Sequence, residues 1–311
     1  MKTVILLTAY NGAEHLPDLL DSLLGQTDPD FSVLMQDDGS SDTTPALLRE
    51  ISGRDPRFTF GREQGRHLGA AGNFCSLIRQ CEGAGRVMLC DQDDVWEPEK
   101  VARLKAAMDA LEAEYGAGVP LLVHSDCSLV GSDGTPIGPS FFRHQGWDPG
   151  AVTLPPLLVQ NNVTGCTLIM NEPLRILIAA HAKAKDLFMH DWFIALTAAS
   201  FGHIAFVDEP LTRYRQHGDN AIGASSRSLV RRGLAAFKNR RESKRRIKLT
   251  YTHTKVFRKL YEGELPPEAL STVSAYLATE RMPKVRRVLA VRRLGCRMQS
   301  PVTRLGQVLF G

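Results

Sequence analysis

Residues 4–24 read VILLTAYNGAEHLPDLLDSLL: a short apolar run, a polar turn and then a stripe of leucines. The run Val4–Leu7 predicts a buried strand, and Thr8–Gly12 predicts the turn that follows it. The leucines recur at the i, i+3, i+4, i+7, i+8 spacing of an amphipathic helix, at Leu16, Leu19, Leu20, Leu23 and Leu24. A strand that leads into a helix indicates an α/β fold.

The same alternation continues along the chain. Further strands are predicted at Phe31–Met35, Phe58–Phe60, Arg86–Cys90, Leu121–His124, Val163–Met170 and Ile204–Val207. Helices are predicted at 42–51, 70–81, 98–111, 172–180 and 190–200, and Leu211–His217 is expected to be extended. This order favours an open, mostly parallel sheet with helices on its faces.

Three polar clusters follow predicted strands: Thr8–Asn11, Asp37–Asp42 and Asp91–Asp94. In open α/β sheets, ligands bind in the crevice outside the carboxyl ends of the strands. We therefore expect the three clusters to meet at one rim and to form a binding site there.

The Asp91-Gln92-Asp93-Asp94 cluster places three carboxylates within four residues. Such groups repel one another unless a cation lies among them, and Mg²⁺ is typically held by one or two carboxylates together with substrate phosphates. The alternative is a solvated acidic turn in which Asp94 caps the next helix. Spacing alone does not separate the two interpretations.

Asp37 and Asp38 could accept hydrogen bonds from a nucleotide base or ribose, or could simply form a turn. Thr8 offers a hydroxyl, and Tyr10 offers a ring that could equally serve packing. The sequence contains neither GxGxxG nor GxxxxGK[ST], so the usual dinucleotide and P-loop phosphate cradles are not expected.

Asp191, between His190 and Trp192, could act as a general base in a partly apolar cleft or could cap a helix. His217 could ligate a metal, could contact phosphate together with Arg213 or Arg215, or could do neither.

Taken in order, these segments resemble family 2 glycosyltransferases of the GT-A fold. The resemblance runs from residue 3 to about 223 and is carried by Thr8–Gly12, Gln36–Asp42, Asp91–Trp96, Asn162–Cys166 and His190–Trp192. The segment Tyr214–Asn220 looks like the branch of bacterial rhamnosyltransferases that build surface polysaccharides.

The resemblance implies an inverting transfer from a nucleotide-diphosphate sugar to the hydroxyl of a saccharide acceptor, which in this branch is often lipid-linked. Rhamnose is the expected sugar, and another hexose such as glucose or galactose is the alternative. A sugar nucleotidyltransferase is a further alternative. That class usually has a Gly-rich phosphate loop with a nearby Lys or Arg, which residues 4–20 lack.

The family's residue roles carry over by position. Thr8, Tyr10 and Asp38 would hold base and ribose, with support from Asp37, and Asp91 would lie beside the nucleotide sugar. Asp93, with Asp94 and with His217 from the far side, would bind Mg²⁺ or Mn²⁺ across the diphosphate, and Asp191 would be the catalytic base. His190 departs from the branch, which has an acidic residue there, so acceptor contact at this position has no assignment.

The formal net charge of +4 is the sum of an acidic and a basic part of the chain. Residues 224–311 hold 21 Lys and Arg against 5 Asp and Glu, whereas residues 1–223 hold 17 against 29. We therefore expect a GT-A catalytic domain over 1–223 and a basic helical C-terminal extension over 224–311. The resemblance does not reach the second of these parts.

The extension alternates basic pairs with apolar residues, which is typical of helices that lie on an anionic membrane surface. Packing on the acidic body, with a solvated basic face, is the alternative. No nucleic-acid partner is expected, because no recognition module is present.

The chain is expected to work in the cytoplasm, at the inner face of the cell membrane. No apolar run reaches the roughly 18 residues of a membrane span, and the apolar run before Thr8 is too short for a signal peptide. The six cysteines contain no CxxC pair, so neither a zinc site nor a disulfide framework is suggested.

Overall fold

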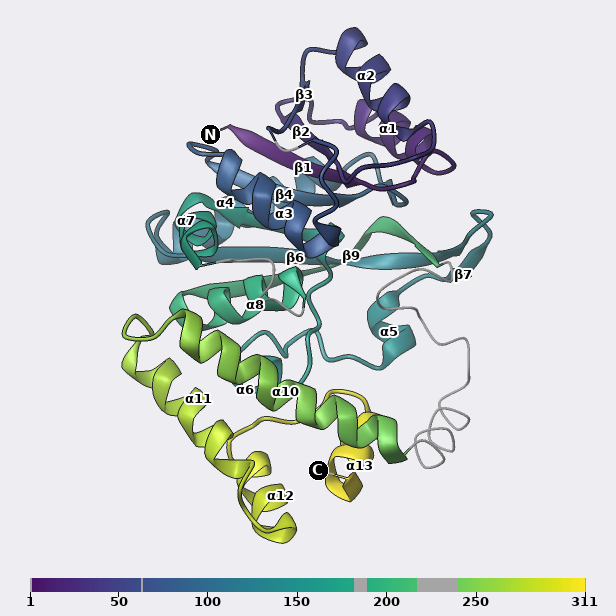
Figure 1. Ribbon diagram of the computed structural model, residues 1–311. Helices are drawn as coiled ribbons and strands as arrows, with labels where there is room; N and C mark the ends of the chain where they lie inside the picture. The colour runs from purple at the N-terminus through teal and green to yellow at the C-terminus, as the bar shows by residue number, and fades with distance from the viewer. Residues whose placement is uncertain (1, 63, 182–188, 217–239, 311) are drawn as a thin grey trace.

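The structure is a computed structural model that describes residues 2–62, 64–181, 189–216 and 240–310 (Figure 1). Its centre is one mixed sheet of nine strands in the order β3-β2-β1-β4-β8-β6-β9-β5, with β7 paired to β6. The strands are β1 (Thr3–Ala9), β2 (Ser32–Asp37), β3 (Phe58–Phe60), β4 (Arg86–Asp91), β5 (Val95–Trp96), β6 (Leu121–Gly131), β7 (Pro136–Gly138), β8 (Leu168–Asn171) and β9 (His203–Gln216).

Helices cover both faces of this sheet, as the expected α/β class requires. The body contains α1 (Leu16–Leu24), α2 (Thr44–Arg54), α3 (Gly69–Gln80), α4 (Lys100–Tyr115), α5 (Phe141–Gln145), α6 (Leu154–Leu157), the 3-10 turn η1 (Gly165–Thr167), α7 (Glu172–His181) and α8 (His190–Phe201). The C-terminal part contains α10 (Arg240–Leu260), α11 (Pro267–Thr279), α12 (Lys284–Arg293) and α13 (Pro301–Phe310).

Alternate residues of β1 divide the core into two layers. Ile5 and Leu7 face α1, α2 and α4, whereas Val4 and Leu6 face α3, α7 and α8. Every residue of β1 is buried, so this strand lies between two helical layers, as the unbroken apolar run at 4–7 predicts.

The N-terminal half of the sheet is parallel, and the register confirms that the strand ends meet at one rim. Ala9 pairs with Asp37, and Thr8 pairs with Asp91. The rest of the sheet is mixed, because β8 runs antiparallel to both of its neighbours, β4 and β6, while β9 runs parallel to β6. The α/β class is thus confirmed, and the parallel part of the sheet is confined to β3-β2-β1-β4 and the β6-β9 pair.

Two strand predictions need correction. Val163–Met170 is not one strand: the chain makes the turn η1, closed by a Thr167 N–H bond to Thr164 O of 3.0 Å, before β8 begins. The segments Ile204–Val207 and Leu211–Gln216 belong to one strand, β9, whose pairing with β6 shifts register after Ser125. The expected end of that segment, His217, lies outside the described residues.

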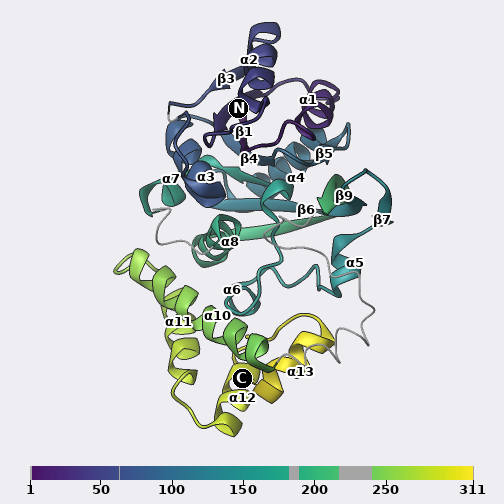
Figure 2. The ribbon, with the colours of Figure 1, turned by 45° about the vertical axis from the view of Figure 1, so that its right-hand side comes forward.

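The C-terminal helices pack on the body (Figures 1 and 2). Tyr261, directly after α10, stacks on Phe193 of α8 with ring centroids 5.7 Å apart, and the ring centroids of Trp192 and His253 lie 4.6 Å apart. Residues of α10, α11 and α12 belong to the same core cluster as those of α8. The domain boundary expected at 223/224 falls outside the described residues, so it stays a prediction.

The six cysteines are free and buried. No helix in the described ranges combines the length and the apolar character needed to span a bilayer.

Candidate active site

A cavity of about 410 Å³ opens where the carboxyl ends of β1, β2 and β4 meet the start of α8. Six of the predicted site residues line it: Thr8, Tyr10, Asp38, Asp91, Asp93 and Asp191. Asp37 and Asp94 do not, and His217 lies outside the described residues. The remaining walls come largely from residues 67–73 and 141–165, segments for which the sequence motifs assign few roles.

One end of the cavity is shaped by Tyr10 and Asp38. The Tyr10 ring is half exposed and lies 4.9 Å from the ring of His67. The buried Asp38 carboxylate accepts hydrogen bonds from the N–H groups of Leu68 (2.5 Å) and Gly69 (2.8 Å). It therefore fixes the N-terminus of α3 beside the cavity, where the helix dipole and free N–H groups favour a negative charge.

Asp37 supports its own turn rather than facing the cavity. Its carboxylate accepts hydrogen bonds from the N–H groups of Gly39 and Ser40, both at 3.0 Å, and from the Ser40 hydroxyl at 2.5 Å. Gly39 has a φ of +87°, a conformation that glycine adopts without strain. These contacts stabilise the turn 37–40 that contains Asp38, and the supporting role of Asp37 toward a nucleotide stays a prediction.

Gln92 connects the end of β4 and the loop after it, residues 91–94 (the acidic loop), to the loop after β1. Its side-chain amide accepts from Tyr10 N–H at 2.6 Å and donates to Tyr10 O at 2.9 Å. This two-way bond joins the loops after β1 and β4 and leaves Asp91 and Asp93 on the cavity wall.

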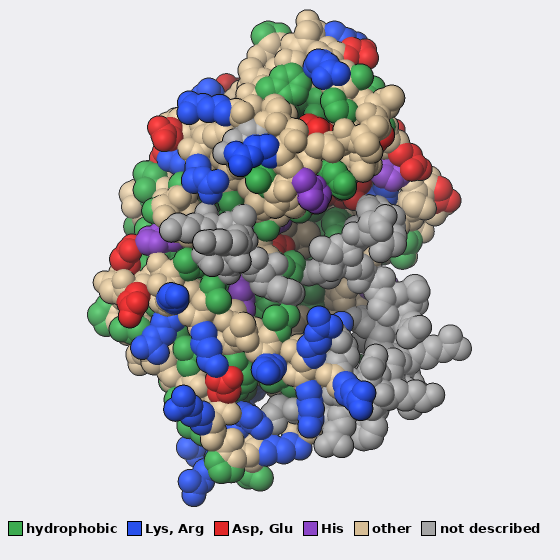
Figure 3. All heavy atoms as spheres, viewed as in Figure 1, with side chains coloured by type: hydrophobic (Ala, Val, Ile, Leu, Met, Phe, Trp, Pro, Cys, Tyr) green, Lys and Arg blue, Asp and Glu red, His purple; other side chains and the backbone are tan. Residues whose placement is uncertain are grey.

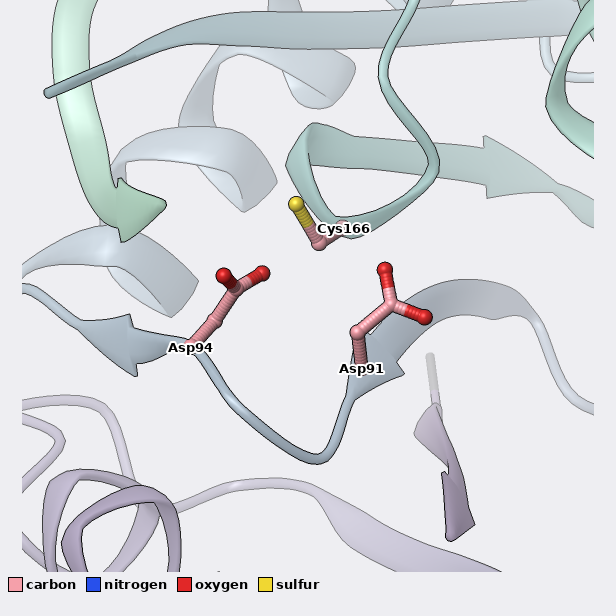
Figure 4. A group of neighbouring side chains, drawn as sticks. All are labelled: Asp91, Asp94 and Cys166. Atoms are coloured by element: carbon pink, nitrogen blue, oxygen red, sulfur yellow. The ribbon is translucent and has the colours of Figure 1, made fainter. Parts of the chain in front are cut away.

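Asp91, Asp94 and Cys166 form the closest group of metal-type ligands among the described residues, with their ligand atoms within 4.8 Å of one another (Figure 4). Burial and the neighbouring carboxylates of Asp94, Asp93 and Asp191 raise the pKa of Asp91 well above its usual value. Burial also raises the pKa of Asp94 to about 7. The raised pKa values mean that full ionisation of these carboxyl groups is unfavourable by itself, and a bound cation would favour it.

The donor set fits a hard divalent cation through its carboxylates. Burial raises the pKa of the Cys166 thiol, so the thiol stays protonated, and the side chain hydrogen-bonds to Asp94. A protonated thiol is a poor ligand for Mg²⁺ or Mn²⁺, which prefer oxygen. Because Asp91 and Asp93 line the cavity while Asp94 is fully buried, the first two are the carboxylates within reach of a diphosphate.

Two buried cations support this loop, and the sequence motifs point to neither role. Lys100 is fully buried, donates to Cys166 O (2.5 Å) and Thr212 Oγ1 (2.8 Å), and lies 3.4 Å above the Trp96 ring. Its electrostatic attraction to Asp94 opposes the burial that lowers the pKa of Lys100 to about 8.

Arg215 is the second of these cations. Its guanidinium donates to Asp93 O (2.9 Å), Ser132 O (2.9 Å) and the Asp18 carboxylate (3.0 Å). Its backbone N–H reaches Asp94 at 3.3 Å. Arg215 therefore joins the acidic loop to α1 and to the β6–β7 turn. Arg213, two residues earlier, pairs instead with Glu97.

Asp191 lies across the cavity from the acidic loop, in the first turn of α8. Its carboxylate accepts the Trp192 N–H at 2.6 Å and also a hydrogen bond from the Gly165 backbone. Burial raises the pKa of Asp191 to about 7. A carboxylate with a pKa near neutrality can accept and release a proton at physiological pH, as a general base must.

His190 also lines the cavity and is held as a neutral ring. It stacks on Phe74 with centroids 4.4 Å apart, and burial lowers its pKa to about 4. A Cβ at position 165 would lie 3.0 Å from His190 Nε2, so glycine there leaves room for the ring. His190 therefore presents no charge beside Asp191.

Part of this chain matches a known protein family in sequence. Residues 4–153 match the family model described as Glycosyl transferase family 2. The chain is similar to this family over just under half of its length. The match covers β1 to α5 and includes both loops that carry the acidic residues of the cavity.

The curated relatives are distant glycosyltransferases. The dTDP-rhamnosyl transferase RfbG of Shigella flexneri is 26% identical over 228 residues, which cover 70% of this chain and 74% of that protein. The putative teichuronic acid biosynthesis glycosyltransferase TuaG of Bacillus subtilis is 25% identical over 53% of this chain and 60% of its own length.

Solved structures share the transferase's fold at low identity. The Staphylococcus aureus protein TarS in complex with UDP superposes with a TM-score of 0.56 at 15% identity, over 99% of this chain and 90% of that one. A mannosyltransferase of Pyrobaculum calidifontis in complex with GDP-Man and Mn²⁺ gives 0.51 at 15% identity, over 94% and 72%. These likenesses support the GT-A fold.

Proposed function

We propose that this glycosyltransferase moves rhamnose from a nucleotide-diphosphate sugar to a hydroxyl of a saccharide acceptor, including a lipid-linked one, in bacterial surface polysaccharide synthesis. The observation that carries the reaction type is the placement of Asp191 across one cavity from Asp91 and Asp93. The choice of rhamnose rests on the likeness to RfbG.

The proposed reaction is a single in-line displacement. Thr8, Tyr10 and Asp38 bind base and ribose at one end of the cavity, and Asp91 lies beside the nucleotide sugar. Asp93, with Asp94 and with His217 as the further ligand expected from the sequence, would hold Mg²⁺ or Mn²⁺. Such an ion, when bound, neutralises charge on the departing diphosphate.

Asp191 removes the proton from the acceptor hydroxyl as its oxygen forms a bond to the anomeric carbon. The bond from that carbon to the diphosphate breaks on the opposite face, and the nucleoside diphosphate leaves with the bonding electron pair. Attack from the face opposite the leaving group inverts the anomeric centre. Burial lowers the pKa of His190 to about 4 and raises that of Asp191 to about 7, so the Asp191 carboxylate is the stronger base of the two.

A thermal-shift screen of nucleoside diphosphates and their sugars, with and without Mn²⁺, tests the donor site. We expect one nucleotide to raise the melting temperature in a Mn²⁺-dependent way, because ligand binding stabilises the folded state. In Asp93→Asn, its affinity should fall about tenfold or more, which corresponds to roughly 1.4 kcal/mol of binding free energy. Asp21→Asn on the exposed face of α1 is the matched control.

Unchanged Mn²⁺-dependent affinity in Asp93→Asn would remove Asp93 from the metal site.

Product analysis distinguishes a glycosyltransferase from a nucleotidyltransferase. Nucleoside diphosphate released together with a glycosylated acceptor supports sugar transfer, whereas pyrophosphate would indicate a nucleotidyltransferase. Replacing dTDP-rhamnose by other hexose donors in the same assay tests the sugar.

We further propose that the transferase associates with the inner face of the cell membrane through α12. On this helix Val285 is 73% exposed and Leu289, one turn later, is 51% exposed. Basic residues flank them, and α12 contains no acidic residue. Figure 3 shows Lys and Arg side chains gathered over the C-terminal helices. Apolar side chains among basic ones suit an anionic bilayer surface.

Flotation with vesicles of phosphatidylglycerol and of phosphatidylcholine checks this association. We expect recovery with the anionic vesicles alone at low salt, and a loss of most of it in Val285→Glu/Leu289→Glu. The control Ile137→Glu/Ile176→Glu changes two apolar residues of the body that are 48% and 52% exposed. Equal recovery with both vesicle types would defeat the electrostatic membrane interpretation.

A further inference from the structure

A second cavity of about 350 Å³ lies within the C-terminal helices, and it shares no lining residue with the candidate active site. Its walls come from α10, α11, α12, α13 and the turn after α6. Figures 1 and 2 show these helices arranged around a common centre at the opposite end of the molecule from α1 and α2. The volume is in the range of small-molecule sites.

The inner wall of this cavity is apolar and rigid. Tyr251 and Tyr276 are buried and stack with ring centroids 4.7 Å apart at an angle of 8°. Their hydroxyl groups are bonded to neighbouring threonines, Tyr276 OH to Thr250 at 2.7 Å and Tyr251 OH to Thr279 at 2.9 Å. Buried Val159 and Val291 complete this wall. A hydrocarbon chain would bury apolar surface here.

The rest of the lining is strongly basic. None of the described residues that line the cavity is acidic. Four arginines border it: Arg287, Arg292, Arg297 and Arg304. Arg292, Arg297 and Arg304 are exposed, whereas the tyrosines are buried, so the positive charge faces solvent and the apolar part lies inside.

Two of these guanidinium groups are held in place by neutral partners. Arg304 donates to Met298 O (3.2 Å) and Gln299 O (3.1 Å), and Arg297 donates to Arg292 O (3.3 Å). Within the described part of the chain, neither Arg297 nor Arg304 pairs with a carboxylate, so the charge of each is not offset by an ion pair. Fixed guanidinium groups match phosphate oxygens in both geometry and charge.

We propose that this cavity is a binding site for a phosphate-bearing lipid, with the hydrocarbon chain against Tyr251 and Tyr276 and the phosphate among Arg292, Arg297 and Arg304. The site is independent of the transfer reaction and differs from the surface of α12 that carries Val285 and Leu289. Val288 and Val291 face this cavity, whereas Leu289 and Arg293 line a groove beside α11.

Calorimetric titration with octyl phosphate below its micellar concentration tests the site, with inorganic phosphate and octanol as separate arms. We expect octyl phosphate to bind one to one and at least ten times more tightly than either part alone. Equal affinity for inorganic phosphate would show an adventitious anion site and overturn the proposal. Equal affinity for octanol would show an apolar cavity without headgroup recognition, which also overturns it.

Two variants locate the binding. Arg292→Gln/Arg297→Gln should weaken octyl phosphate binding at least tenfold, whereas Arg258→Gln/Lys259→Gln removes the same charge from the exposed face of α10 and should change it less than twofold. Val288→Phe, which fills the cavity without a change in charge, should also abolish binding. Full octyl phosphate affinity in Val288→Phe would overturn the proposal.

The same variants separate this site from membrane association. Val288→Phe should still float with phosphatidylglycerol vesicles, and Val285→Glu/Leu289→Glu should still bind octyl phosphate. Each protein is checked by its melting temperature, so a loss of binding counts against an intact fold. Loss of octyl phosphate binding in Val285→Glu/Leu289→Glu would place the ligand on the outer surface of α12 and overturn the cavity assignment.

Discussion

Replacing Asp191 by Asn should lower the rate of sugar transfer by about 10²- to 10⁴-fold, the usual contribution of a general base, while nucleotide affinity stays unchanged. The amide cannot accept the acceptor's proton, but its oxygen can still accept the Trp192 N–H, a bond of 2.6 Å in the native protein. Burial already disfavours the charged carboxylate, so the variant should melt at the same temperature or higher.

The pH profile gives an independent readout of the same residue. A base must be ionised to act, and burial raises the pKa of Asp191 to about 7. The native kcat/KM should therefore fall about tenfold per pH unit below pH 7 and level off above it. His190, with a pKa of about 4, does not titrate in that range, but Asp94, with a pKa of about 7, does. The limb is therefore assigned to Asp191 only where Asp191→Asn removes it.

The control for Asp191→Asn is Asp208→Asn, which changes an exposed carboxylate on β9 and should leave both rate and profile intact. Transfer by Asp191→Asn within tenfold of the native rate would remove Asp191 from the base role. An unchanged acid limb in a slow variant would show that another group titrates there.

The rim of the sheet could be predicted from sequence because its parts are local. Each cluster directly follows a short apolar strand, and parallel pairing then aligns Thr8 with Asp91 and Ala9 with Asp37. Once the strands were identified, the meeting of their carboxyl ends required no knowledge of distant contacts.

The supporting cations could not be found in this way, because their partners are remote. Lys100 bonds to residues 66 and 112 positions away, and Arg215 bonds to Asp18 at a separation of 197. One signal was nevertheless present for Lys100. It precedes Leu104 and Met108 by four and eight positions, so it lies on the buried stripe of α4, where a lysine requires a partner.

The packing of the C-terminal helices had a similar unused signal. The basic pairs of this segment suggest a membrane surface, but α10 also carries Tyr251 and Phe257, Tyr261 directly follows it, and all three are buried. Large aromatic residues bury much surface in protein cores, which indicates packing against protein. Basic residues such as Lys244, Arg258 and Lys259 are exposed, so packing on the body and contact with a membrane are compatible.

The second large effect is expected for Arg215→Met. This change removes the donors that now serve Asp93 O, Ser132 O and the Asp18 carboxylate. Arg215 is 5% exposed, and loss of one partner from a buried charged network typically costs about 3–5 kcal/mol of unfolding free energy. Because Asp18 is largely exposed and can regain water, we expect about 3 kcal/mol, near the low end of that range.

Chemical denaturation of Arg215→Met and Arg213→Met provides a matched comparison on one strand. Arg213 pairs with Glu97 at 2.8 Å, but its side chain is 53% exposed, and surface pairs contribute about 0–1 kcal/mol. Arg213→Met should therefore cost less than about 1 kcal/mol. Equal costs for the two variants would show that Arg215 does not hold the acidic loop.

Arg215→Lys separates the charge of this side chain from its geometry. A lysine keeps a positive charge near Asp18 but cannot reach three acceptors in different directions, since it lacks the planar fork of arginine. Because Arg215 fixes the carbonyl of Asp93, Arg215→Lys should weaken Mn²⁺-dependent nucleotide binding more than it lowers the melting temperature. The reverse outcome would make Arg215 a purely structural residue. A loop that must present two carboxylates to a cation needs this fixed geometry, because their mutual repulsion otherwise drives them apart.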